Sequence, residues 1–196
     1  MHYQPIESFL FEEEALFLEK KLQQLPWRQV KYFTPARGYV KTPRLSWVAG
    51  FHTDNFYELT LSSGQKVTPN PFPSWIYPLK NLVEEKLQFS FNYCLFQLYR
   101  DGNDSIAYHS DDEDFVDKTI AILTIGSQRP FILKNKQTGV KESFALKSGD
   151  LFVMTDCQKT HLHSLPKIKQ DTPPRYSLSF RRVLSEKGSK NYYKFN

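Results

Sequence analysis

The segment from Tyr108 to Asp111 holds two residues of the types and the spacing that a metal site needs. If the segment is extended, His109 and Asp111 stand two positions apart and point to the same side. One imidazole and one carboxylate leave a site incomplete, and His161 or His163, just beyond another predicted strand, is available as a third ligand. Two histidines and one carboxylate hold Fe(II) on one side and leave positions open for oxygen and a co-substrate. A chance His-x-Asp pair in a loop is the alternative.

The last apolar run of the chain alternates polar and apolar side chains. In a strand, alternate residues share one face. The polar face carries Arg175, Ser177, Ser179 and Arg181. Guanidiniums that are buried without partners are costly, and a dicarboxylate would supply those partners through paired, charge-assisted hydrogen bonds. The run therefore predicts a site for a dicarboxylate.

A second strand offers further polar groups. The run at 92–99 places the amide of Gln97 and the phenol of Tyr99 on one face. Exposure on an edge strand is the alternative for the two arginines at the end of the last run, Arg181 and Arg182, and we adopt it for Arg182.

Length and composition limit the class of protein. The 196 residues include 26 Lys and Arg against 21 Asp and Glu, a formal charge of +5, and 40% are hydrophobic, too many for a disordered chain. Two cysteines build neither a disulfide scaffold nor a four-cysteine zinc site. No apolar run approaches the roughly 18 residues of a spanning helix, and the N-terminus lacks a signal peptide's features. We expect a soluble intracellular protein that does not bind membranes, nuclear in a eukaryote and cytoplasmic otherwise.

Opposite charges gather in separate segments. Residues 20–51 contain seven Lys or Arg and no acid, whereas residues 101–117 contain seven acids and no Lys or Arg. The aromatic residues of the basic segment are Trp27, Tyr32, Phe33, Tyr39, Trp47 and Phe51. Cations interleaved with aromatic rings are typical of nucleic-acid binding, with ordinary core packing as the alternative for each ring. The acidic segment is either a solvated loop or part of the metal site. The basic residues after Ser164 contact phosphates or form a solvated tail.

The hydrophobic pattern predicts two helices followed by strands. One helix runs from a cap at Ser8 to Leu25, and the other covers Ser74 to Leu87. Prolines and glycines in residues 27–72 indicate short strands and loops. Later apolar runs, separated by turns, cover 92–99, 119–125, 130–134, 140–146, 151–154 and 175–183. Six short strands without an intervening helix favour a β-sandwich, a jelly roll or a small barrel.

Four segments resemble, in the same order, the AlkB family of Fe(II)- and 2-oxoglutarate-dependent dioxygenases, which repair alkylated nucleic-acid bases. They are residues 91–102, His-Ser-Asp-Asp-Glu at 109–113, His-Ser-Leu-Pro at 163–166 and Arg-Tyr-Ser-Leu-Ser-Phe-Arg at 175–181, with weaker similarity around Pro43-Arg44. The resemblance implies a mostly β fold with flanking helices (α+β), in which a double-stranded β-helix, or jelly-roll, core has N-terminal helices packed outside. It implies a single dioxygenase domain over 1–196: helices and a nucleotide-recognition region in 1–90, the jelly-roll catalytic core in 91–184 and a basic tail in 185–196.

The resemblance also assigns site residues. The iron ligands are His109, Asp111 and His163, because His163 precedes Ser-Leu-Pro and stands twelve residues before Arg175; His161 is then a pocket-wall or surface residue. The 2-oxoglutarate contacts are Gln97, Tyr99, Arg175, Ser177 and Arg181. The catalytic residues are Asp111 and Glu113, and the substrate contacts are Arg44, Trp47, Phe51, Asp112 and Glu113. The family usually has Asn in place of Ser177 and Gln97, so we expect these changes to affect co-substrate affinity and not the reaction type.

The implied reaction is oxidative demethylation of bases such as N1-methyladenine or N3-methylcytosine, with Fe(II), 2-oxoglutarate and O2. It releases formaldehyde, succinate and CO2. These damaged bases are cationic, so a carboxylate such as Glu113 is a suitable neighbour. The partner is DNA, RNA or both, with alkylated bases flipped out or already single-stranded, and we expect a monomer.

Three alternatives remain at the level of sequence. The first is the same chemistry on a protein side chain, a lipid or another small molecule. The second is a non-catalytic nucleic-acid-binding jelly-roll module. The third is a structural zinc ion at the metal site, which is disfavoured because three ligands with an open face suit catalysis better.

Overall fold

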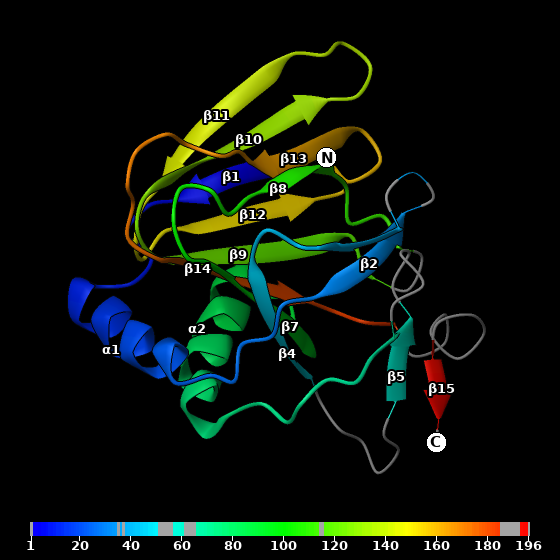
Figure 1. The fold of residues 1–196 in the computed structure, drawn as a ribbon. Coiled ribbons are helices and arrows are strands. Elements are labelled where there is room, and N and C mark those ends of the chain that lie inside the picture. The colour runs from blue at the N-terminus through cyan, green and yellow to red at the C-terminus, as the bar shows by residue number, and fades with distance from the viewer. Residues whose placement is uncertain are drawn as a thin grey trace.

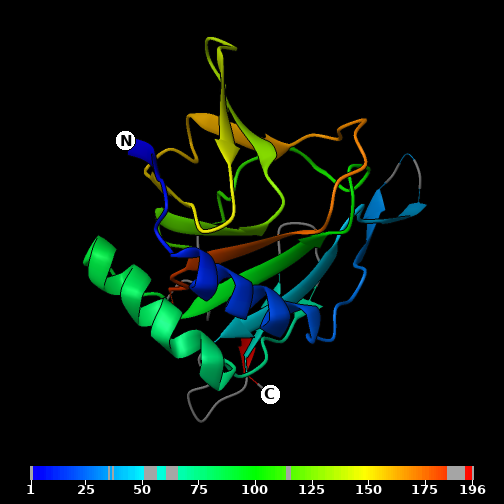
Figure 2. The same cartoon turned by 90° about the vertical axis from the view of Figure 1, so that its left-hand side faces the viewer.

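The computed structural model describes residues 2–34, 36, 38–50, 57–60, 66–113, 116–184 and 193–195. Two main antiparallel sheets face each other, and two helices lie against the outside of the larger one (Figure 1, Figure 2). The helices are α1, Glu12–Gln23, and α2, Tyr77–Leu87, and a short 3-10 turn, η1, Ser74–Ile76, leads into α2. This arrangement is the predicted jelly-roll core with helices packed outside.

The large sheet has the strand order β1-β12-β9-β14-β7-β4. The bounds of its strands are β1 His2–Ile6, β12 Leu151–Thr155, β9 Thr119–Gly126, β14 Arg175–Arg181, β7 Tyr93–Tyr99 and β4 Leu45–Gly50. The small sheet has the order β11-β10-β13-β8. Its strands are β11 Lys141–Leu146, β10 Arg129–Asn135, β13 His161–Leu165 and β8 Ile106–His109. Outside these sheets, β2 Lys31–Thr34 pairs with β3 Gly38–Lys41, and β5 Tyr57–Thr60 pairs with β6 Lys66–Val67 and β15 Tyr193–Phe195.

Two apolar clusters hold the layers together, because each sheet buries its apolar faces against a neighbouring layer. One cluster lies between the two sheets and includes Ile120, Ile122, Phe131, Leu133, Phe152 and Met154. The other joins the large sheet to the helices and includes Leu18, Leu22, Leu79, Val83, Phe96, Leu178 and Phe180. The apolar positions of β14 thus face the helices, which leaves its polar positions facing the space between the sheets.

The first helix begins later than predicted, and the prediction of a cap at Ser8 is wrong. Ser8 has a φ of 50°, and its N–H donates to the carboxylate of Asp150 at 2.9 Å. Glu14 supplies the cap instead, because its side chain accepts the N–H of Phe11 at 2.8 Å. The helix itself is confirmed, and its buried residues, Ala15, Leu18 and Leu22, are spaced so that they form one apolar stripe.

All six predicted apolar runs form strands, but four strands lie outside the regions where strands were predicted: β15, β1, β8 and β13. The last two carry His109 and His163, which therefore lie within strands and not beyond them. Polar side chains at these positions face the space between the sheets, where a sequence pattern expects apolar residues. For this reason the hydrophobic pattern does not reveal the two strands that carry candidate metal ligands.

Arg182 is not exposed on an edge strand as predicted. It directly follows β14, which lies inside the large sheet between β9 and β7. Its guanidinium lies 3.9 Å from the ring centre of Phe89 and donates to the backbone oxygen of Ser90. Its role is packing at the end of the strand. Among the helices of the described residues, none is long and apolar enough to cross a membrane.

Candidate metal centre and the cavity beside it

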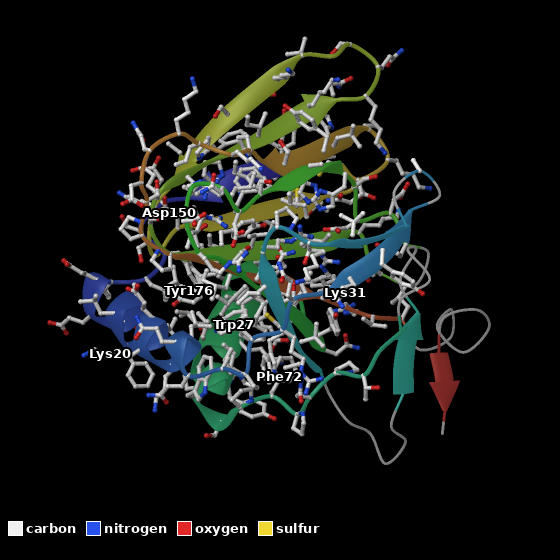
Figure 3. All side chains as sticks on the ribbon, in the orientation of Figure 1. Lys20, Trp27, Lys31, Phe72, Asp150 and Tyr176 are labelled. Atoms are coloured by element: carbon white, nitrogen blue, oxygen red, sulfur yellow. The ribbon has the colours of Figure 1, made fainter. Side chains whose placement is uncertain are left out.

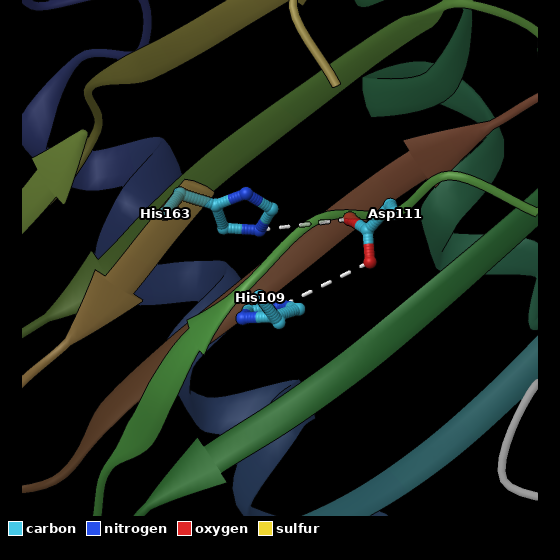
Figure 4. Close-up of side chains that lie close together, drawn as sticks. All are labelled: His109, Asp111 and His163. Carbon is cyan, nitrogen blue, oxygen red and sulfur yellow. Dashed lines mark ion pairs between the residues drawn. The ribbon is translucent and has the colours of Figure 1, made fainter. Parts of the chain in front are cut away.

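Three side chains converge between the sheets: two come from the neighbouring strands β8 and β13, and one from the segment that follows β8 (Figure 4). His163 on β13 pairs directly opposite His109, the last residue of β8, and Asp111 follows two residues later. The Nε2 atoms of the two histidines lie 3.8 Å (His109) and 3.6 Å (His163) from the carboxylate oxygens of Asp111. These separations are too long for hydrogen bonds. All three possible ligand atoms lie within 4.8 Å of one another, so they surround a gap that fits one metal ion.

The protonation states suit a divalent cation. Burial raises the pKa of Asp111, but the charges of Arg181, His163 and His109 and a hydrogen bond from Arg181 outweigh it and bring the pKa to about 2. Burial lowers the pKa of His163 to about 3, against the attraction of Asp111. At neutral pH the centre therefore offers an ionised carboxylate and a neutral imidazole, the forms that bind metals. The Nδ1 atom of His109 donates to the backbone oxygen of Ala107 at 2.9 Å, which leaves Nε2 free to coordinate.

A buried glutamine, which the sequence patterns did not reveal, holds the Asp111 backbone. The chain leaves the strand ladder after His109, so the Asp111 N–H needs another acceptor. Gln158, in the turn before β13, provides it through Oε1 at 3.0 Å. Lys136 links the same two segments, because its Nζ donates to the backbone oxygen of Gln158 at 2.8 Å and to Ser110 at 3.2 Å. The turn that leads to His163 therefore also positions the segment of Asp111.

The metal centre opens into a cavity of about 760 Å³ between the sheets. Arg175 lies in its wall, fully buried, and donates to Thr124 at 2.8 Å beside the ring of Tyr99. In the described part of the chain, the Nε atoms of Arg175 and Arg181 have no hydrogen-bond partner. Buried donors without partners are costly, so a bound anion is the expected occupant. A dicarboxylate such as 2-oxoglutarate fits both this donor set and the neighbouring metal ligands.

Comparison with known proteins agrees with this geometry. The family model of the 2OG-Fe(II) oxygenase superfamily matches residues 5–184. Human alpha-ketoglutarate-dependent dioxygenase alkB homolog 3 is 29% identical over 189 residues, which cover 89% of this chain and 63% of that protein. Human DNA oxidative demethylase ALKBH2 is 31% identical over 180 residues, covering 82% of this chain and 67% of that protein.

The chain belongs to the AlkB family of the 2OG-Fe(II) oxygenase superfamily. The solved structure of OsALKBH1 has the same fold, with a TM-score of 0.68 and 15% sequence identity, over 92% of this chain and 96% of that one. Oxygenases of this superfamily use Fe(II), 2-oxoglutarate and O2, and the residues around the cavity are of the types that bind the first two.

The cavity gathers most of the residues that the AlkB resemblance assigned, including Arg44, Trp47, Gln97, Tyr99, Glu113, Arg175, Ser177 and Arg181. Asp112 is exposed and is not among the lining residues. Phe51 lies outside the described residues. His161 is neither in the pocket wall nor at the surface: it is buried against the ring of Tyr3, with ring centres 5.3 Å apart. Two further residues were not predicted: Tyr93 lines the cavity, and Thr124 accepts a hydrogen bond from Arg175. The AlkB resemblance assigned no role to either, and only the alternation of side chains along their strands could have indicated that they face the cavity.

The aromatic residues of the basic segment whose side chains are described, Trp27, Tyr39 and Trp47, lie in three different environments. Trp27 is a packing residue: its ring lies 5.8 Å from that of Tyr176, and its Nε1 donates to the backbone oxygen of Leu22 (Figure 3). Trp47 packs on Phe96 at 5.1 Å and also lines the cavity, whereas Tyr39 is 78% exposed. Ordinary core packing thus explains one of these rings, and the cavity wall includes another.

Gln158→Leu preserves size but removes the acceptor for the Asp111 N–H. We expect the affinity of the metal-free protein for Mn(II), measured by titration, to fall about 10- to 100-fold, because partners that orient ligands contribute that much to metal binding. Gln158→Glu keeps an acceptor and should stay within a few-fold of wild type. Wild-type Mn(II) affinity in Gln158→Leu would contradict the positioning role.

His163 makes the metal-free protein sensitive to acid. The folded state keeps the imidazole neutral down to its pKa of about 3, whereas the unfolded chain takes up a proton below the ordinary value of 6.5. Stability is therefore complete above pH 6.5 and declines as the pH falls toward 3. Between pH 7.5 and 5, we expect wild type to lose about 2 kcal/mol more of its free energy of unfolding than His163→Gln, as measured by denaturant titration. Equal losses would contradict the neutral, buried state of His163.

Proposed function

We propose that the protein is an Fe(II)- and 2-oxoglutarate-dependent dioxygenase that removes methyl groups oxidatively from alkylated bases in DNA or RNA. One observation carries this proposal: the three metal ligands and Arg175, whose Nε has no hydrogen-bond partner in the described part of the chain, line the same cavity as Arg44, Trp47 and Glu113. A cavity of about 760 Å³ has room for both a co-substrate and a flat substrate. The similarity to AlkB homolog 3 and to the DNA oxidative demethylase ALKBH2 supports this substrate class.

His109, Asp111 and His163 would hold the iron from one side. When bound, Fe(II) activates O2, and the reaction consumes one O2 and one 2-oxoglutarate to give succinate, CO2 and a hydroxymethyl group on the base. The hydroxymethyl base then breaks its N–C bond to release formaldehyde and the unmethylated base. The protein contributes a fixed, open ligand set and a closed space around the reacting groups.

Arg175 and its neighbours would bind the co-substrate. A guanidinium pairs with a carboxylate through two parallel hydrogen bonds, and burial between the sheets keeps water from competing for it. Thr124 and Tyr99 hold the Arg175 side chain, so little rearrangement is needed on binding. The Tyr99 hydroxyl lies 3.2 Å from the amide oxygen of Gln97, which adds a second polar group to this wall.

Glu113 would contribute a negative charge to the cavity and Arg181 a positive one. Arg181 donates to Asp111 at 2.8 Å, and Asp111 and Glu113 both raise its pKa against the effect of burial. Glu113 thus contributes negative charge close to the metal centre, where a cationic methylated base gains more than a neutral one. Trp47 contributes an aromatic ring to the wall of the same cavity. This arrangement favours N1-methyladenine and N3-methylcytosine over their undamaged forms.

A formaldehyde assay tests the reaction. Purified protein receives Fe(II), 2-oxoglutarate and air with a single-stranded oligonucleotide that carries one N1-methyladenine. We expect formaldehyde and succinate in equal amounts from wild type and neither from His109→Ala or Asp111→Ala, because each variant leaves the metal with two ligands. Turnover in either variant at the wild-type rate would show that the substituted residue is not a metal ligand. Succinate without formaldehyde on every methylated oligonucleotide would leave the oxygenase chemistry but reject nucleic acid as the substrate.

Arg175→Ala tests the co-substrate anchor. We expect the 2-oxoglutarate KM to rise about 10- to 100-fold, since a hydrogen bond to a charged group contributes about 1.5–3 kcal/mol. Arg182→Ala is the matched control, because it removes a guanidinium next to the same strand but outside the cavity, and its KM should stay at the wild-type value. An unchanged KM in Arg175→Ala would show that another residue binds the carboxylate of 2-oxoglutarate.

A further inference from the structure

Two lysines on the small sheet stand in an unfavourable arrangement. Lys134 on β10 and Lys141 on β11 are directly opposite each other in the strand register. Like charges at directly opposed positions destabilise an antiparallel pair. Within the described part of the chain, neither lysine forms an ion pair that would compensate for this repulsion. The sheet therefore carries a concentrated positive charge that its own packing does not require.

Both lysines point at one exposed aromatic ring. The ammonium groups of Lys134 and Lys141 lie 5.7 and 5.8 Å from the ring centre of Tyr108, which is 37% exposed. A cation over a ring face gains modestly at an exposed site, about 0.5–1 kcal/mol, and this attraction brings the two charges together. The result is an aromatic residue with two cations beside it on an open surface.

The position of Tyr108 links this surface to the metal centre. Tyr108 directly precedes His109 on β8, and Tyr108, unlike Lys134 and Lys141, is among the residues that line the cavity of the metal ligands. Because side chains alternate along a strand, Tyr108 points to the outer face of the small sheet while His109 points inward. A chain that placed one unit in the cavity would pass over β8, and its neighbouring units would lie on this outer face.

We propose that Tyr108, Lys134 and Lys141 bind the phosphodiester backbone of the strand whose damaged base enters the cavity. This inference rests on the proposed function and adds where the strand lies. A backbone phosphate placed between the two ammonium groups removes their mutual repulsion, and the Tyr108 ring gives a flanking base a face on which to stack. The surface makes a nucleotide within a strand a better substrate than the isolated nucleoside.

The test compares a polymer with a nucleoside. The probes are a single-stranded pentanucleotide with one N1-methyladenine, the unmodified pentanucleotide, and N1-methyladenosine without phosphate. The variants are Lys134→Gln combined with Lys141→Gln, and Lys141→Glu alone. Lys141→Glu places opposite charges across the strands, so its Tm should not fall even though its strand binding does. Lys147→Glu, with the same charge change just beyond the other end of β11, is the control.

We expect the KM for the methylated pentanucleotide to rise roughly tenfold at low salt in both lysine variants, as for the loss of one charged hydrogen bond. Turnover of N1-methyladenosine and the kcat should stay at wild-type values. In fluorescence anisotropy with the unmodified pentanucleotide, the slope of log Kd against log salt should fall by about 0.7 for each phosphate contact removed. Lys147→Glu should match wild type in every measurement.

If both lysine variants bind the pentanucleotide with the wild-type Kd and the wild-type salt slope, the proposed strand-binding role of this surface is wrong. A loss of the same size in Lys147→Glu would also overturn it, because net charge alone would then explain the effect. The anisotropy measurement needs no turnover, so it can contradict the strand-binding surface even if the protein demethylates bases. It can also support the strand-binding surface if no formaldehyde is released and the proposed function is wrong.

Discussion

The contact between the carboxylate of Asp111 and the guanidinium of Arg181 is the interaction on which the site depends. Both groups lie between the sheets at a separation of 2.8 Å, and removing either partner would leave a buried charge without compensation. The same contact keeps Asp111 ionised, so the carboxylate is ready for a metal before any metal arrives. Arg175 adds a second buried guanidinium to the same cavity, and its Nε atom has no hydrogen-bond partner among the described residues. A fold that buries these groups without filling the space between them is suited to bind a cation and an anion side by side.

Strand pairing supplies the precision that this arrangement needs. His109 and His163 are direct partners in the β8–β13 ladder, so the backbone fixes their separation. Asp111 lies beyond the ladder, and its position depends on the side chain of Gln158. The inward face of β14 places Arg175 and Arg181 at opposite ends of the same strand. A single substitution should therefore displace Asp111 more easily than the two histidines, which the strand ladder holds.

The sequence predicts the parts that follow from alternation and local chemistry. The six apolar runs, the two helices and the inward face of Arg175 and Arg181 all follow from side-chain period. The strands β8 and β13 could not be found in this way, because histidines occupy the inward positions. The cap by Glu14, the packing role of Trp27 and the burial of His161 depend on contacts between segments far apart in the sequence. For the same reason no pattern reveals Gln158, which reaches Asp111 across 47 residues.

The central claim is that one cavity binds Fe(II) and 2-oxoglutarate together, and anaerobic absorption spectroscopy tests it most directly. Fe(II) is titrated into the protein in the absence of oxygen, with and without 2-oxoglutarate. A visible charge-transfer band should appear only when both are present and should saturate at one iron per chain. The absence of a band at saturating concentrations, or an equal band without 2-oxoglutarate, would contradict the claim.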